Sequence, residues 1–139
     1  MGPYIRMALF CESVTYDVDG AMTISGVFDQ ITLAPLATLP MELNLKLVVG
    51  AVRGDAEIGP VPLCIRWESP NGSRSQEVAI PFLLPESVPY TYVCGIHFTI
   101  ERLGTHWMEL TIRDVLLTRI PLPVVQGEQI VLPPSVVVQ

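Results

Sequence analysis

The feature that most constrains the fold is a strict alternation of apolar and polar positions over residues 41–53. One face of this segment carries Leu43, Leu45, Leu47 and Val49, and the other carries Glu42, Asn44, Lys46 and Val48. A period of two indicates a β-strand with one buried face, because a helix would scatter these leucines around its axis. Residues 41–53 are therefore predicted to form the longest strand of the chain.

The same β pattern recurs along the chain, in runs rich in Val, Ile, Leu, Thr and aromatic residues. These runs predict strands over residues 4–12, 21–33, 61–69, 75–83, 90–101, 105–112 and 115–122. Turns are expected at 17–20, at Pro70-Asn71-Gly72-Ser73 and at Arg113-Asp114, with a polar loop at 54–59 and Pro-bracketed connections at 34–40 and 85–89. No segment combines a helical period with caps, and the 13 prolines suit sheet edges and loops better than helices.

These elements predict an all-β protein with about eight short antiparallel strands. Several strands have one apolar and one mixed face, which favours an antiparallel β-sandwich, immunoglobulin-like or related, over a barrel. The length of 139 residues suits one domain. We expect that domain to span residues 1–125, followed by an apolar C-terminal tail at 126–139. The tail either packs on its own domain or adds to the sheet edge of a neighbour.

Composition narrows the possible partners. Hydrophobic residues make up 50% of the chain and charged residues 16%, which excludes an intrinsically disordered chain. A surface short of charge suggests that a protein partner covers part of it. The net charge of −6 argues against nucleic acid as the partner. No apolar run is long enough to cross a membrane and no signal peptide is apparent, so we expect a cytoplasmic protein.

Three stretches carry a resemblance to a known family. They are Leu9-Phe10-Cys11-Glu12, Ile24-Ser25-Gly26-Val27-Phe28-Asp29, and a closing segment that holds Gly104, His106-Trp107, Leu110, Ile112, Asp114, Leu117 and Ile120-Pro121-Leu122-Pro123-Val124. Together they resemble a family of small uncharacterised bacterial β-sandwich proteins. The chain departs from the pattern at Val115, where a glycine often follows the turn aspartate, and in its apolar tail. The resemblance implies a sandwich fold and a bacterial origin. It carries over no functional residue.

The cysteines are Cys11, Cys64 and Cys94. Free cysteine is among the most buried residue types, so three reduced thiols in the core are expected. A bridge between Cys64 and Cys94 across two sheets is the alternative. The Asn71-Gly72-Ser73 sequence matches a glycosylation sequon, which in a cytoplasmic protein is simply a hairpin turn.

No catalytic set stands out. The histidines are His97 and His106, and His97 falls between Ile96 and Phe98, so it points away from their apolar face. Either histidine could pair with Cys94, but that cysteine lies mid-strand among apolar neighbours. We therefore assign no catalytic residue and expect a protein that is not an enzyme. A cleft around His97 or His106 would favour a hydrolase instead.

No metal or cofactor is assigned either. The Cys and His residues are too scattered for zinc. Calcium is the better candidate metal, and the acidic residues that could bind it from loops are Asp17, Asp19, Asp55 and Glu57. They form only a fragment of a calcium loop, so a weak site is left open.

The expected function is a non-enzymatic interaction or assembly module. It would self-associate as a homodimer or larger, or dock onto a larger protein complex, without cofactor, nucleic acid or membrane. The alternative is a small-ligand or carbohydrate binder that uses loops at one end of the sandwich. The aromatic residues available for such a site are Trp67, Trp107, Tyr4, Tyr16, Tyr90 and Tyr92.

Overall fold

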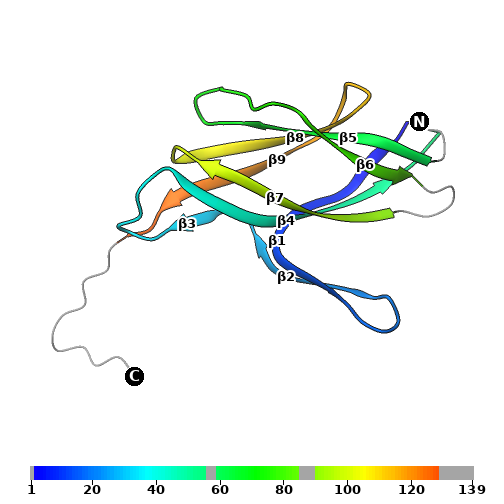
Figure 1. Ribbon diagram of the computed structural model, residues 1–139, viewed down its shortest axis with the longest axis horizontal. Coiled ribbons are helices and arrows are strands. Elements are labelled where there is room, and N and C mark those ends of the chain that lie inside the picture. Colours follow the sequence, from blue (N-terminus) through cyan, green and yellow to red (C-terminus); the bar gives the residue numbers. More distant parts are fainter. Residues whose placement is uncertain (1, 56–58, 85–89, 129–139) are drawn as a thin grey trace.

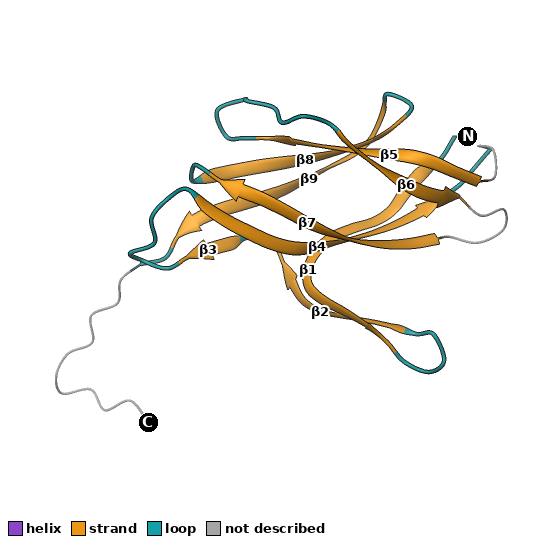
Figure 2. Ribbon diagram, in the orientation of Figure 1, coloured by secondary structure: helices purple, strands orange, loops and turns teal. Residues whose placement is uncertain are grey.

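The computed structural model describes residues 2–55, 59–84 and 90–128. Within these residues the chain forms nine strands in two sheets packed face to face, with no helix between them (Figures 1 and 2). The predicted β-sandwich is confirmed. In this part of the chain no helix is long and apolar enough to cross a membrane.

The first sheet has four antiparallel strands in the order β2-β1-β4-β7. Their bounds are Met22–Phe28 for β2, Tyr4–Tyr16 for β1, Met41–Val52 for β4 and Tyr90–Ile100 for β7. The β1–β2 hairpin projects away from the two layers (Figure 1). At the opposite edge of this sheet, β7 pairs with β4 over its whole length.

The second sheet has five strands in the order β3-β9-β8-β5-β6. Their bounds are Ile31–Leu33 for β3, Val115–Gln126 for β9, Gly104–Ile112 for β8, Gly59–Glu68 for β5 and Val78–Leu84 for β6. The short β3 pairs with β9 in parallel, whereas the other described pairs are antiparallel. The edges of the second sheet are therefore β3 and β6.

The core lies between the sheets and follows the predicted alternation. Leu45, Leu47 and Val49 of β4 are buried, and Glu42, Asn44 and Lys46 on the opposite face are exposed, although Val48 on that opposite face is buried as well. The facing strand β8 buries His106, Met108, Leu110 and Ile112. Since each strand places every second side chain inward, the apolar periods of the sequence determine which face of each sheet packs.

Several predicted elements differ from the structure, beginning with the strand expected at 4–12, which continues to Tyr16. The single strand expected at 21–33 is two strands, because the chain leaves the first sheet at Phe28 and enters the second at Ile31. Asp29 and Gln30, which are polar and poor at forming strands, make that crossing. The hairpin after β5 is also longer than expected, since β6 begins only at Val78. The predicted connection at 85–89 lies outside the described residues.

The last strand extends further than predicted. It was expected to end at 122, with the tail standing apart, but β9 continues to Gln126. The turn before it is as predicted: Arg113 and Asp114 have φ angles of 51° and 64°, the left-handed pair that a tight two-residue hairpin requires. The tail beyond residue 128 lies outside the described residues.

Candidate functional site

The edge strands β6 and β7 of the two sheets approach each other over only a short stretch. A groove of about 540 Å³ lies there, between side chains of β5 and β6 on one side and of β7 on the other. Its apolar lining is Ile65, Trp67, Val78, Ile80, Cys94, Ile96 and Phe98, and its other lining residues are Ser75, Gln76, Gly95, His97 and Thr99. The lining of this groove, called the edge groove below, contains no aspartate, glutamate, lysine or arginine.

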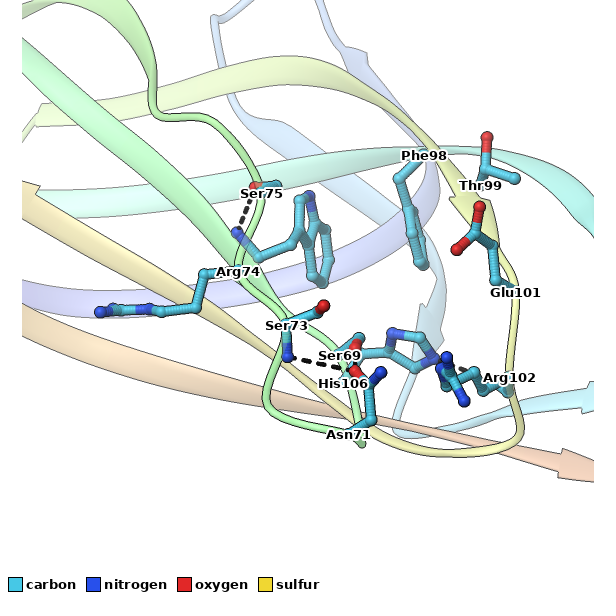
Figure 3. A pocket seen from close by; sticks show the side chains of 11 residues that line it. Ser69, Asn71, Ser73, Arg74, Ser75, Phe98, Thr99, Glu101, Arg102 and His106 are labelled. Atoms are coloured by element: carbon cyan, nitrogen blue, oxygen red, sulfur yellow. Dashed lines mark hydrogen bonds between the residues drawn. The ribbon is translucent and has the colours of Figure 1, made fainter.

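A second hollow, the end pocket, adjoins the edge groove at the end of the sandwich. It has a volume of about 280 Å³ and lies between the loop after β5 and the loop after β7. Trp67, Ser75, Phe98 and Thr99 line both hollows. Figure 3 shows Phe98 and His106 directed into the end pocket, while Arg74 points away from it.

A stack of aromatic rings joins the sheets at this opening. Trp67 of β5 stacks on Phe98 of β7 with ring centroids 4.4 Å apart, and on Phe10 of β1 at 5.7 Å. Phe98 in turn meets the edge of the His106 ring at 5.9 Å. Because Trp67 already stacks on two rings, much of its face is occupied. What it offers to the hollows is chiefly its edge.

The loop after β5 is held by its own hydrogen bonds. Asn71 Oδ1 accepts from the Ser73 amide at 3.1 Å and from the Ser69 hydroxyl, and the Gly72 amide donates to the Ser69 carbonyl at 2.9 Å. The Ser75 hydroxyl donates to the Gln76 carbonyl and accepts from the Trp67 amide at 2.9 Å. The predicted turn at Asn71-Gly72 is confirmed. The hydroxyls of Ser69 and Ser75 are both used in hydrogen bonds of this loop.

Charged residues gather on the outer face of the second sheet. Glu109 has a side chain only 11% exposed and contacts Arg74 and, at 3.7 Å, Arg119. Arg119 also bonds Glu68 at 2.6 Å and lies 4.5 Å above the Trp107 ring. These charges pair with one another on the face that turns away from the core. The edge groove is thus left as an uncharged surface.

The histidines lie as the alternation predicted. His97 is exposed, with its Nδ1 2.6 Å from Asn44 Oδ1, and His106 is buried, its Nε2–H donating to the Arg102 carbonyl at 3.1 Å. Cys94 and His97 project from opposite faces of β7. A cleft does surround His106, as a hydrolase would need. However, the Nε2–H of His106 is already used in its hydrogen bond to the backbone carbonyl.

The cysteine prediction is partly wrong. Cys94 lines the edge groove and Cys11 is fully buried, but Cys64 sits between the inward-facing Leu63 and Ile65 and so lies on the outer face of its sheet. A bridge from Cys64 to Cys94 is therefore out of reach. Burial raises the pKa of the Cys94 and Cys11 thiols, whereas the pKa of Cys64 is raised first by its hydrogen bond to Glu77.

The loop acids considered for calcium are not brought together. Asp17 Oδ1 accepts from the amides of Asp19 and Ala21, both at 2.9 Å, and so closes its own turn. That turn is at the tip of the β1–β2 hairpin, apart from the connection after β4 that holds Asp55 (Figure 1). Glu57 lies outside the described residues. Among those described, no group of three or more His, Cys, Asp or Glu could hold a metal.

Of the aromatic residues considered for ligand binding, only Trp67 lines either hollow. Trp107 lies on the outer face beneath Arg119. Sequence reasoning missed Phe98 and the serines of the loop after β5. In the sequence, Phe98 stood out only as a neighbour of His97 on the apolar face of the strand predicted at 90–101. Nothing in the local pattern marks where that strand meets another sheet.

Comparisons with known proteins found a family and similar solved structures. A model of a family of unknown function, DUF6941, matches residues 6–125. No curated protein matches. One similar solved structure is the CARDB domain of the PF1109 protein from Pyrococcus furiosus in complex with di-metal ions. It is 13% identical, with a TM-score of 0.43, over 89% of this chain and 96% of that one.

Another is an immunoglobulin-like protein, PA1606, from Pseudomonas aeruginosa. It is 16% identical, with a TM-score of 0.42, over 89% of this chain and 97% of that one. At this level of likeness neither structure carries an argument about what the present chain binds.

Proposed function

The chain belongs to this family of unknown function, and we propose its role from its own geometry: a non-enzymatic interaction module that self-associates, or docks onto a larger protein complex, through the opening between β6 and β7. One observation carries the proposal. The edge strands of the two sheets, β6 and β7, approach each other over only a short stretch, and an uncharged, mostly apolar groove lies between their side chains. Soluble sandwiches usually close or charge such edges, because an open apolar edge recruits other chains.

Backbone geometry supports the same reading. In the described residues β7 pairs only with β4 and β6 pairs only with β5. Each edge therefore presents backbone groups on the side that faces the opening. A chain that enters there can pair with one edge while its alternate side chains fill the groove. This form of binding needs no catalytic group and no cofactor.

Light scattering on the full chain tests self-association. We expect a mass that is a multiple of 15.3 kDa. The Val78→Arg variant should lower it to one chain, because a guanidinium at the groove rim opposes burial there. Val78 is 57% exposed, so the unbound fold tolerates the change.

The matched control is Val115→Arg. Val115 is 59% exposed and lies outside the edge groove, so this variant should keep the wild-type mass. A wild-type mass of one chain at every accessible concentration would refute self-association. It would leave docking onto a different protein as the remaining form of the proposal.

The end pocket favours a second candidate function, small-ligand or carbohydrate binding. It combines the edges of Trp67 and Phe98 with hydroxyl and amide groups of the loop after β5. The stacked faces of Trp67 weaken this candidate, because a sugar would need an open ring face to stack on. Titration of a Trp107→Phe variant with simple sugars, followed by Trp67 fluorescence, tests it. An unchanged spectrum would rule out these ligands.

A further inference from the structure

The edge groove is complementary to a binding segment that is extended, apolar and uncharged. Its lining offers aliphatic side chains and the rings of Trp67 and Phe98, with no aspartate, glutamate, lysine or arginine. Its volume of about 540 Å³ takes a short run of side chains. An α-helix bonds its backbone groups within itself, so it would leave the backbone groups at the edge of β7 without a partner. A strand-like segment fits both the shape and the free edge of β7.

The chain itself contains such a segment. Residues 130–138 read Ile-Val-Leu-Pro-Pro-Ser-Val-Val-Val, which is six aliphatic residues, two prolines, one serine and no charge. A residue that precedes proline favours an extended backbone, so the Pro133-Pro134 pair disfavours a helix and lowers the cost of ordering an extended chain. The segment and the groove therefore match in polarity and in the backbone form required.

The position of residues 126 and 127 indicates whether the segment fills the groove of its own chain or that of a second copy. The Gly127 amide donates to the Leu33 carbonyl at 2.8 Å, and Gln126 Nε2 donates to the Ala34 carbonyl at 2.8 Å and the Pro35 carbonyl at 2.9 Å. These bonds fix the end of β9 beside β3. That is the edge of the second sheet opposite to β6 (Figure 1).

To reach its own groove, the chain would have to cross the end of the second sheet. From the end of β9 to β6 there are three strand spacings of about 4.8 Å, roughly 14 Å, which uses about four residues of extended chain. Those four residues include Ile130 and Val131, which would then lie over the polar loop after β7. In a second copy, both aliphatic runs remain available for the groove.

We propose that residues 130–138 of one chain occupy the edge groove of a second copy, between β6 and β7. This rests on the proposed function, self-association through that opening, and names the element that is exchanged. Each copy carries one segment and one groove, so reciprocal exchange closes a dimer. The aliphatic side chains of the segment contact Ile80, Ile96 and the edge of Trp67, and its backbone pairs with β7.

The test uses the full chain with charges placed in the segment. Leu132→Asp combined with Val137→Asp interrupts both aliphatic runs, and we expect its mass by light scattering to fall to one chain. The control is Gln129→Asp combined with Gln139→Asp, which adds the same two charges outside the runs and should stay associated. Thermal unfolding of each variant, read alongside, shows whether the sandwich itself is intact.

Mixing separates exchange between copies from other arrangements. The Val78→Arg chain keeps its segment but loses its groove, and the Leu132→Asp, Val137→Asp chain keeps its groove but loses its segment. Each alone should be one chain, and an equimolar mixture should restore a species of two chains. In a Trp107→Phe background, acrylamide quenching of Trp67 should decrease on mixing, because the segment covers the groove.

The outcomes distinguish the exchange of residues 130–138 from the proposed function, self-association through the opening between β6 and β7. If the wild type is associated and Val78→Arg dissociates it while the segment variant does not, self-association through the opening stands and the exchanged segment is wrong. If the segment variant dissociates but Val78→Arg does not, the segment binds a different surface and the inference also fails. If the wild type is one chain, both the inference and self-association fail together.

Discussion

Phe98 is expected to be the ring that holds the two sheets together beside the edge groove. It stacks on Trp67 at 4.4 Å and meets His106 edge-on at 5.9 Å. Each such ring pair contributes about 0.5–1.5 kcal/mol beyond simple burial, so Phe98→Leu should lower the free energy of unfolding by roughly 1–3 kcal/mol. A loss of about 2 kcal/mol corresponds to a Tm lower by roughly 8 °C for a chain of this size.

The assay is urea unfolding in the Val78→Arg background, where association should not add to stability. Phe28→Leu is the control, because Phe28 also packs against the core but has no described ring contact, and it should cost less than about 1.5 kcal/mol. A double-mutant cycle of Phe98→Leu with Trp67→Leu should give a coupling of about 1 kcal/mol. A coupling inside the usual additivity error of about 0.5 kcal/mol would refute the reasoning.

Three further predictions follow from single positions. Gly26 has a φ of 69°, and an added Cβ would lie 2.7 Å from Glu12 Oε2, so Gly26→Ala should lower the free energy of unfolding by about 1–2 kcal/mol in thermal unfolding. Glu12→Ala should recover only part of this loss, because it relieves the clash but not the backbone strain. Full recovery would contradict a contribution from backbone strain. Glu109→Gln removes the carboxylate that pairs with Arg74 and should lower the free energy of unfolding in urea by about 1–2 kcal/mol, a loss that added salt should reduce. No loss would show that solvent already screens the charge of the half-exposed Arg74. Burial raises the pKa of the Cys94 thiol above its ordinary 9.0, so as pH rises the unfolded chain loses this proton before the folded chain does. The free energy of unfolding should therefore fall as pH rises past 9.0, and Cys94→Ala should reduce that fall. An unshifted midpoint in thiol labelling against pH would contradict this.

The β-sandwich was predictable because its determinants are local. The alternation from Leu43 to Val49 shows which side chains enter the core, whatever strand packs opposite. The Arg113-Asp114 turn was likewise predictable from the two residues between two apolar runs. Where the prediction failed, at Asp29, the chain passes from one sheet to the other. The alternation of apolar and polar residues is the same in both sheets, so it does not show where the chain passes from one sheet to the other.

The candidate site was not predictable for the same physical reason. Trp67 and Phe98 are 31 positions apart, and each reads as an ordinary inward residue of its own strand. Only the strand order places β6 and β7 at facing edges and leaves the space between Ile80 and Ile96 open. The sequence did identify the C-terminal segment as unusually apolar. The sequence alone did not show which surface such a segment could cover.

The anchoring of Gly127 on β3 has a consequence for how assemblies of this chain could vary. Only Glu128 and Gln129 separate that anchor from the aliphatic run, so in the proposed exchange these two residues set the length of the connection. Hinge length governs whether an element returns to its own body or is exchanged, since it sets the local concentration of the segment at each groove. A few glycine and serine residues inserted there should favour self-filled single chains. Quaternary structure would then change while the groove and segment stay the same.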